Sequence, residues 1–502
     1  MWFAENKSWS EYRRSLGGFS AIVCKDGSTV WAEDASGKTI ASGEAGVDDA
    51  SVIQSAVNAA PTDSRIVVKG KFTIDKKITI DKILTITNGW FVCTTSPAIE
   101  IFDGDTSGSN PDKVTFIDCR FEGDGTNDIL KFRYCSNWQI ISCKIWNCSR
   151  AIVLERTWGD ASLLFTSIID ATPPDNDGAI SCITPENDNT NSFTVAHTSI
   201  RIRNNNAFCI YCHPQASGRV HNILIHDVQH EQEGCFLGGI CTNIKIRDCG
   251  LHGLAGSLKL DDAGALDIKG GILSNIYLSW CEKVFVRTNL EAKMQDKPLL
   301  EIGGGRDILI EKPVFRGLVV NEGVPYFKIG AEYNCENFVI DGGIVVGGGA
   351  GAFLETEANT VHKRCFVRNV LFYSFNGNSR YSTCYIHKTN GRQVYFENCC
   401  FLETDYCSLT DYLPATLLRD CIGEYLDRNS DTATFSGDGT TTQFSIAHGL
   451  VSAPQKVLVT PMTADAASDF YVTADDTNIY INYKSAPPSG TDNLKLSWYA
   501  EV

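Results

Sequence analysis

The chain has 502 residues, more than one compact hydrophobic core usually holds, so we expect an elongated fold or several domains. Its formal net charge of −16 argues against a nucleic-acid partner, which needs a basic face. Its apolar runs stay below the ~18 residues of a membrane helix, so we expect no membrane insertion. Residues 1–20 lack the continuous apolar segment of a secretion signal.

The N-terminal segments predict a β lead-in followed by a cap. We assign residues 1–43 to the lead-in, in which Val23–Asp34 indicates a hairpin. The stretch from Asp48 to Ala60 begins with acidic residues and then repeats apolar residues at i, i+3 and i+4. It predicts a short amphipathic helix that covers the first coil of a stacked domain, since an exposed ladder edge promotes aggregation.

A motif of β-forming residues followed by Cys or another apolar residue recurs through residues 44–428. With Cys119 as the register mark, equivalent positions fall near 143, 168, 198, 228, 249, 271, 289, 313, 343, 370, 399 and 421. The residue before the mark is often Asp or Asn, which tolerate the left-handed conformation of a sharp bend. These residues are Asp118, Asp227, Asp248, Asn369, Asn398 and Asp420.

A second set of short alternating runs follows each mark, such as Ala98–Ile101 and Ala151–Glu155. Each repeat therefore contains one bent strand pair and one short flat strand. Successive repeats are predicted to stack these strands into parallel sheets. Residues 431–502 contain regularly spaced short strands with turn signals, which predict an accessory β-sandwich.

The twenty cysteines lie mostly in strand-like apolar runs, so we expect mainly free, buried thiols. The spacing Cys209-x-x-Cys212-His213 occurs in metal and redox motifs. On a strand, however, residues three apart point to opposite faces, so we expect no metal site and no cofactor. Tyr211 and His213 remain candidate sugar contacts.

The helix rich in Asp, the strand RIVVKGKFTI (Arg65–Ile74) and the repeating coils together resemble the pectate-lyase-like superfamily. That group includes polygalacturonase-type hydrolases and the tailspike depolymerases of phages and archaeal viruses. The resemblance implies an all-β fold: a right-handed parallel β-helix with a short N-terminal capping helix and a C-terminal β-sandwich-like domain. It also implies a polysaccharide partner, an extracellular or virion-surface location and a homotrimer, although no coiled-coil heptad is present.

In this superfamily the substrate groove follows the short flat sheet, so outward residues of the second set of runs are candidates. Glycoside hydrolysis needs two carboxyl groups about 5 Å apart for retention or ~6.5–9.5 Å apart for inversion. Coils spaced by ~4.8 Å can supply either geometry. The candidate catalytic carboxylates are Asp261, Asp262, Glu231, Glu233, Glu155 and Glu301. The candidate substrate-binding residues are Lys259, Arg156, Trp158, Tyr211, His213 and His230.

The Asp261-Asp262 pair is similar to the paired Asp of polygalacturonase-type hydrolases. The Asn-Thr-Asp expected one coil earlier is replaced by Leu237-Gly238-Gly239, so the residues favour a different hydrolase subtype. Each candidate also fits a structural role: Asp-Asp in a turn, Glu231 and Glu233 in a solvated loop, and Glu155 in a surface salt bridge with Arg156. Tryptophans suited to sugar stacking, or else to the core, are Trp138, Trp146, Trp158 and Trp280.

Three functions follow. The first is an endo-acting glycoside hydrolase that uses a carboxylate pair from the candidate set. The second is a polysaccharide lyase acting on a uronate polymer, with Lys259 or Lys269 as base and Asp261, Asp262 and Asp267 as cation ligands. The third is a non-catalytic glycan-binding or structural spike of a virus or cell surface.

Overall fold

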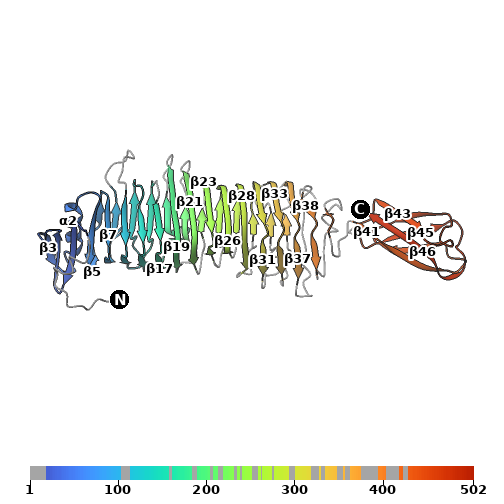
Figure 1. Cartoon of the computed structure of the whole chain (residues 1–502), viewed down its shortest axis with the longest axis horizontal. Helices are drawn as coiled ribbons and strands as arrows, with labels where there is room; N and C mark the ends of the chain where they lie inside the picture. Colours follow the sequence, from blue (N-terminus) through green and yellow to red (C-terminus); the bar gives the residue numbers. More distant parts are fainter. Residues whose placement is uncertain are drawn as a thin grey trace. The chain divides into compact units, whose positions relative to one another are not determined.

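The structure is a computed structural model of the full chain, and the strands of its domains are drawn in Figure 1. It describes residues 18–102, 113–157, 161–183, 189–203, 207–212, 219–230, 235–237, 240–251, 258–261, 263–273, 276–292, 300–317, 327–329, 334–347, 354–356, 362–374, 394–402, 418–421, 428–450 and 452–502. The chain divides into two compact units, Met1–Ile276 and Tyr277–Val502. Among the described residues, α2 (Asp49–Ala59) is the only helix.

Three antiparallel strands begin the first unit: β1 (Ala21–Asp26), β2 (Thr29–Asp34) and β3 (Thr39–Glu44). The predicted hairpin is formed by β1 and β2, which are joined through Gly27 at φ 57°. β1 also pairs in parallel with β4 (Ser64–Lys69), the first strand of the repeating sheet. The lead-in is thus hydrogen-bonded directly to the repeat.

The capping helix α2 agrees with the predicted range 48–60. Its buried face consists of Val52, Ile53, Ala56 and Val57, with the spacing that the sequence indicated. Asp49, in its first turn, is fully buried. Its Oδ2 lies 2.7 Å from Lys25 Nζ and accepts a hydrogen bond of 2.7 Å from the Thr73 amide. A buried ion pair with these added hydrogen bonds fixes the helix against the first coil.

The remaining long-sheet strands of the first unit pair in parallel, each with the strand one coil further along. They are β5 (Lys71–Ile74), β7 (Leu84–Thr87), β8 (Trp90–Cys93), β10 (Val114–Ile117), β11 (Arg120–Glu122), β13 (Gln139–Ile141), β14 (Lys144–Trp146), β16 (Ala161–Leu164), β17 (Ser167–Ala171), β19 (Asn189–Ile202), β21 (Arg219–His230), β23 (Ile240–Arg247), β24 (Gly250–Leu251) and β26 (Ala263–Leu273).

A second parallel sheet of the first unit contains the short strands, and we call it the short sheet. They are β6 (Ile78–Ile80), β9 (Ile99–Ile101), β12 (Leu130–Arg133), β15 (Ile152–Glu155), β18 (Gly178–Ile183), β20 (Phe208–Cys212), β22 (Cys235–Leu237) and β25 (Leu258–Asp261). Coil after coil alternates between the two sheets. The predicted right-handed parallel β-helix is therefore confirmed.

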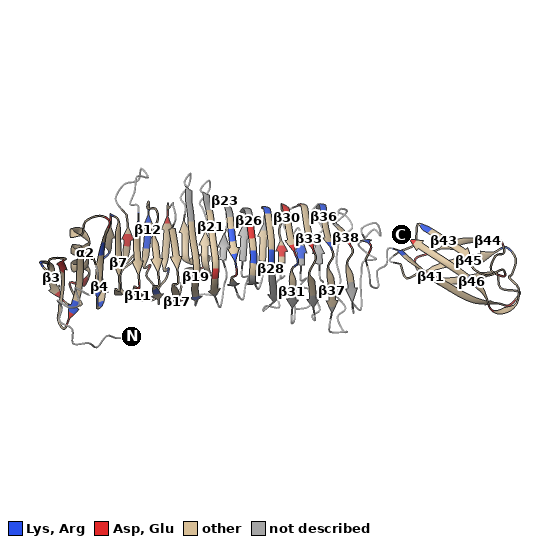
Figure 2. Ribbon diagram, viewed as in Figure 1, with Lys and Arg blue, Asp and Glu red and all other residues tan. Residues whose placement is uncertain are grey.

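The second unit begins with the same architecture. Its short strands are β27 (Ile276–Ser279), β29 (Leu300–Ile302), β32 (Phe327–Ile329) and β35 (Leu354–Thr356). Its other parallel strands are β28 (Cys281–Ala292), β30 (Gly305–Glu311), β31 (Val314–Gly317), β33 (Cys335–Asp341), β34 (Ile344–Gly347), β36 (His362–Arg368), β37 (Leu371–Ser374), β38 (Val394–Glu397), β39 (Cys400–Leu402) and β40 (Leu418–Arg419). Basic and acidic residues lie side by side on these strands (Figure 2).

The bends within coils have the left-handed backbone that the sequence predicted. All six Asp and Asn residues named for this position have positive φ, from 48° at Asp227 to 58° at Asn369. Some form ladders along the stack: Asn398 Nδ2 donates to Asn369 Oδ1 at 2.9 Å, and Asn369 Nδ2 donates to Asp341 Oδ1 at 2.7 Å. These amide bonds connect the bends of successive coils.

The predicted register agrees with the pairing at most positions and was wrong at two. Strand pairing aligns Thr166, not Ile168, with Cys143, and Thr288, not Asn289, with Pro313. Cysteines occupy several of these inward positions, including Cys119, Cys143 and Cys249. Of the sixteen cysteines whose side chains the structure describes, all but Cys400 are buried. Burial raises the pKa of the Cys249 thiol to about 11.

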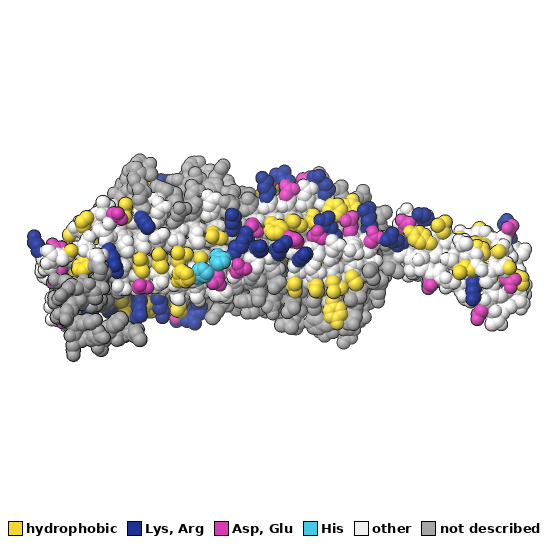
Figure 3. Space-filling model, in the orientation of Figure 1, with side chains coloured by type: hydrophobic (Ala, Val, Ile, Leu, Met, Phe, Trp, Pro, Cys, Tyr) yellow, Lys and Arg dark blue, Asp and Glu magenta, His cyan; other side chains and the backbone are white. Residues whose placement is uncertain are grey.

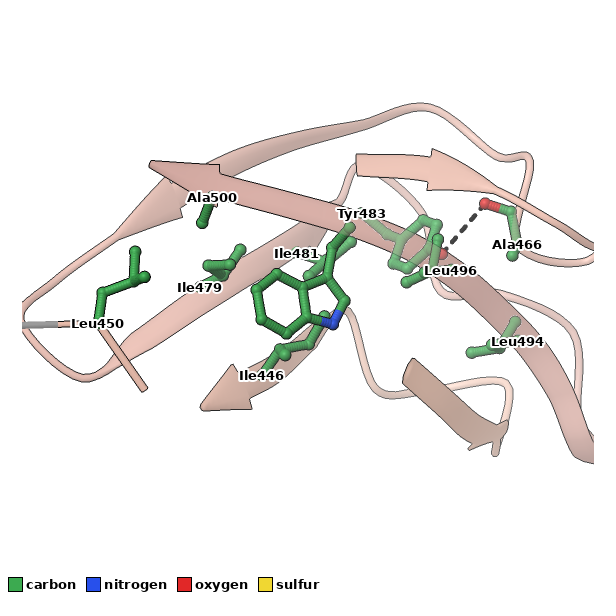
Figure 4. Close-up of a cluster of buried hydrophobic side chains, with 10 residues drawn as sticks. Ile446, Leu450, Ala466, Ile479, Ile481, Tyr483, Leu494, Leu496 and Ala500 are labelled. Atoms are coloured by element: carbon green, nitrogen blue, oxygen red, sulfur yellow. Dashed lines mark hydrogen bonds between the residues drawn. The ribbon is translucent and has the colours of Figure 1, made fainter. Parts of the chain in front are cut away.

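The last strands of the second unit form the predicted β-sandwich. One sheet contains β41 (Arg428–Gly437), β46 (Gly490–Glu501) and β43 (Lys456–Pro461). The other contains β42 (Gln443–Ala447), β45 (Asn478–Tyr483) and β44 (Phe470–Ala474). Trp498 belongs to the cluster of buried hydrophobic side chains of this domain. Within it, Tyr483 Oη donates to the Ala466 carbonyl at 3.1 Å (Figure 4). The domain limits 1–43, 44–428 and 431–502 stay predictions.

The packing of the first unit's core predicts that removing one aromatic ring lowers stability strongly. Phe121 is fully buried, and its ring centroid lies 5.2 Å from that of Phe91 and 5.6 Å from that of Phe116. Phe121→Ala should lower the free energy of unfolding by about 3–5 kcal/mol, because it leaves a cavity in a close-packed core. Denaturant unfolding followed by circular dichroism measures this. Phe165→Ala, which removes a ring that is 60% exposed, should change it by less than ~0.5 kcal/mol, and equal effects would contradict this core assignment.

The left-handed bends predict that stability depends on which residue type occupies position 369. Asn369→Gly keeps the positive φ available, whereas Asn369→Val places a β-branched residue in a forbidden region. Both variants lose the same side-chain hydrogen bonds, so their difference isolates the backbone. We expect the Val variant to be less stable than the Gly variant by about 1–2 kcal/mol in the same unfolding measurement. Equal stabilities would mean that the bend does not hold residue 369 left-handed.

Candidate functional site

Outward side chains of the short sheet form rows because its strands are paired in register. In the first unit Glu100, Lys131 and Val153 are aligned on successive strands, and Arg133 is aligned with Glu155. Lys131, Arg133 and Glu155 are partly exposed, as the alternation predicted. The rows bring together residues that are about one coil apart in the sequence.

Six residues at the ends of β9, β12 and β15 form what we call the Glu155 cluster: Phe102, Lys131, Arg133, Tyr134, Glu155 and Arg156. The Glu155 carboxylate lies 2.9 Å from Lys131 Nζ and 3.2 Å from Arg133 Nε. The predicted salt bridge with Arg156 was wrong in its partner, since these cations come from the preceding strand. Two ion pairs hold the carboxylate at the outer surface of the sheet.

Aromatic rings support the cations of this cluster. The Arg133 guanidinium lies 4.9 Å from the centre of the Phe102 ring and 5.6 Å from that of Tyr134. Arg156 lies 4.9 Å from the Tyr134 ring centre, and its Nη1 donates to Tyr134 Oη at 2.6 Å. Tyr134 is 8% exposed, so its ring is a buried support for both arginines. Three cations and one carboxylate give the cluster a local charge of +2 in an acidic chain.

Other outward positions of the short sheet are shielded from solvent. Val153 and Ser181 are 3% and 0% exposed, and Glu100 is 7% exposed beneath Lys77, whose Nζ lies within 2.5 Å of Glu100 Oε2. Alternation along the strands puts Glu100 and Ser181 on the outer face, yet both are buried, because alternation fixes the face of a side chain but not what covers that face. Tyr211, aligned with Ser181, is half-buried, and burial raises its pKa. Its ring stacks on Phe208 at 5.8 Å.

The other predicted residues are placed by backbone alone or lie outside the described residues. Lys259 and Asp261 lie in β25 on the short sheet. His230 ends β21 and therefore belongs to the long sheet, not to the groove as predicted. Glu301 lies in β29 of the second unit, opposite Lys328 in β32. Those outside the described residues are Asp262, Glu231, Glu233, Trp158 and His213.

Each strand of the short sheet is one rung of the stack, and the number of rungs between two carboxylates limits whether they can form a catalytic pair. Leu154 is aligned through Cys182, Cys212 and Leu237 with Leu260, four rungs further. Glu155 and Asp261, which follow Leu154 and Leu260, are therefore about 19 Å apart, four times the ~4.8 Å strand spacing. The catalytic pairs of glycosidases need less than ~9.5 Å. These two carboxylates cannot form one pair.

Sequence reasoning missed Phe102 and Tyr134, whose role depends on contacts between coils. It also missed an exposed cluster at the bends of the long sheet. There the Phe165 ring stacks on the His197 ring, with 4.9 Å between their centres. His197 Nδ1 lies 2.9 Å from Asp227 Oδ2, and this hydrogen bond holds the pKa of the Asp227 carboxyl below its usual value. Figure 3 shows the histidines beside hydrophobic side chains on one face. Trp138, a candidate stacking platform, is a core residue that is 1% exposed.

Within the part of the chain that the structure describes, no three His, Cys, Asp or Glu side chains are grouped so as to hold a metal ion. The one described helix is too short to cross a membrane.

No protein-family model matches the chain, and no curated protein matches it. Among solved structures, it is similar to PfbA, a surface adhesin of Streptococcus pneumoniae, with 12% identity, a TM-score of 0.41 and coverage of 67% of this chain and 91% of that one. It is also similar to a tailspike mutant of Escherichia coli bacteriophage HK620 in complex with a pentasaccharide (10% identity, TM-score 0.41, coverage 93% and 92%). A third is the Gp54 tailspike of Acinetobacter baumannii bacteriophage AP22 in complex with a capsular saccharide (8% identity, TM-score 0.37, coverage 88% and 92%). The parallel β-helix itself is established by this chain's own strand pairing.

Proposed function

We propose that this protein binds a long polysaccharide along the outer face of its short sheet and cuts it as an endo-acting glycoside hydrolase. The observation that carries the proposal is the Glu155 cluster. It presents a partly exposed carboxylate among guanidinium, ammonium and aromatic groups at the outer face of a sheet whose side chains are aligned from strand to strand. An extended polymer can contact such a repeating face over several units, and the charged groups can orient its hydroxyls.

In this mechanism Glu155 serves as the base or nucleophile, because ion pairs with Lys131 and Arg133 fix its position. The partner acid has to lie within one or two rungs. Asp261 is too distant for that role, so the partner comes from nearer residues. Asp160, the next acidic residue along the chain after Glu155, lies outside the described residues and is the first to mutate.

A polysaccharide lyase is the second candidate, and the local charge of +2 favours it. A uronate polymer carries carboxylates that the Glu155 cluster can attract, although the whole chain is acidic. The lyase hypothesis named Asp267 as a cation ligand. That residue lies in β26 of the long sheet, where it forms an ion pair with Arg247, so it is a poor partner for Lys259 on the short sheet.

The proposal includes a place of action. A polysaccharide-cutting β-helix works where the polymer is, so we propose a virion-surface or extracellular protein. A homotrimer belongs to the same proposal, as does action without a cofactor. Binding without cleavage is the remaining alternative, in which the Glu155 cluster would only hold the polymer.

The test is an assay of new reducing ends, with and without chelator, on neutral and uronate polysaccharides. We expect release that does not depend on the chelator, and a loss of about 100-fold or more in Glu155→Gln, as removal of a catalytic base produces. The matched control is Glu397→Gln, which breaks an equivalent ion pair, with Arg419, away from the cluster. This control should keep full activity.

Each other result has a defined meaning. Release confined to uronates, abolished by chelator and giving unsaturated products, would establish the lyase. Polymer binding without any product would leave a binding spike. Full activity in Glu155→Gln would remove Glu155 from the mechanism.

A further inference from the structure

A cavity of about 280 Å³ lies in the second unit, where three coils turn into β28, β30 and β33. Trp280, Gly304 and Asn334 directly precede these strands. Their rungs are joined by hydrogen bonds from the Cys281 amide to the Gly304 carbonyl at 3.3 Å and from the Gly305 amide to the Asn334 carbonyl at 3.2 Å. The cavity is lined by Trp280, Glu282, Gly305, Arg306, Asn334, Cys335 and Glu336.

Trp280 has an unusual conformation for its size. Its φ is 49°, in the left-handed region where Gly, Asn and Asp are the usual residues. Its side chain is 49% exposed, so burial offsets little of the roughly 1 kcal/mol that this backbone costs. Tyr134 and Arg156 have the same left-handed backbone (φ 53°) directly after β12 and β15, so this conformation belongs to the turn after a short strand. The exposed indole is the feature of Trp280 that suits contact with a ligand.

The polar wall of the cavity consists of alternating charges. Glu282, Arg306 and Glu336 are aligned on successive strands at the outer face. Arg306 Nη2 lies 2.6 Å from Glu282 Oε1, and Arg364 Nη2 lies 2.7 Å from Glu336 Oε1. The charged lining residues, two carboxylates and one guanidinium, sum to −1, and Arg364, which pairs with Glu336, lies outside the lining. The wall therefore offers both donors and acceptors and does not attract an anion.

We propose that this cavity binds one neutral sugar ring of the polysaccharide. The apolar face of the ring lies on the Trp280 indole. Its hydroxyls donate to the carboxylates of Glu282 and Glu336 and accept from Arg306. An anionic sugar would meet two carboxylates, and a cationic one would meet the guanidinium, so a neutral pyranose is the chemistry that fits. The volume is close to the lower end of the ~300–1,000 Å³ of ligand pockets, which suits a single ring.

This inference rests on the proposed polysaccharide binding and assigns a sugar class to a site apart from the Glu155 cluster. The test is calorimetric titration of the full chain with hexasaccharides of glucose, mannose, galactose and galacturonate. The variant is Trp280→Asn, since Asn tolerates positive φ. We expect at least one neutral hexasaccharide to bind, with a Kd that rises about tenfold or more in the variant, equivalent to ~1.4 kcal/mol. The variant should melt at the same or a higher temperature.

A merely structural tryptophan gives the opposite result, because its replacement would lower the melting temperature and leave the Kd unchanged. That outcome overturns the pocket while leaving polysaccharide binding intact, as does binding of galacturonate alone. The control is Tyr471→Ala, which removes an aromatic ring that is 60% exposed on the C-terminal sandwich and should leave the Kd within about twofold. Failure of the wild-type chain to bind any hexasaccharide or parent polymer overturns the proposed function together with the pocket.

Discussion

Most described coils of this protein bend at the same place through a residue in the left-handed conformation, whereas β28 continues through Arg287 without one. Asp118, Asp227 and Asn398 all have φ near 50° at this bend. If one coil turned a residue earlier, its strand would shift by one position and expose its apolar side chains. The parallel hydrogen-bond ladders of both sheets therefore depend on this row of bends.

The same constraint that aligns the backbone also aligns the side chains. Inside, it produces rows of buried Cys and Phe; outside, it places Lys131 beside Glu155 and Glu282 beside Arg306. In such a fold, surface sites are formed by the residues that occupy the same outward position on neighbouring strands. The Glu155 cluster and the Trp280 cavity are two results of this rule, since charged side chains on successive strands are aligned in both.

Most of the fold could be predicted from the sequence, because the repeat imposes local signals that need no knowledge of distant contacts. The capping helix was found within one residue at each end, and the Asp and Asn bends were found from their residue type. The register failed at Thr166 and Thr288, where a polar Thr takes the inward position that Cys or an aliphatic residue marks elsewhere.

The site was predictable only in part. Glu155 and Arg156 were identified, but their partners Lys131 and Tyr134 depend on an alignment between coils about 22 residues apart. Trp280 was named as a stacking platform, whereas the charged row beside it became visible only with the strand register. Burial of Ser181 could not be predicted, because alternation says nothing of what covers an outward face.

The central claim is that the outer face of the short sheet holds the polysaccharide. The most direct test is a crystal structure of the full chain with an oligosaccharide of a polymer that it binds. We predict sugar rings over β12 and β15, with hydroxyl or carboxylate groups within hydrogen-bond distance of Arg133, Glu155 or Arg156. Sugar rings found only on the C-terminal sandwich, with the short sheet empty, would contradict the account.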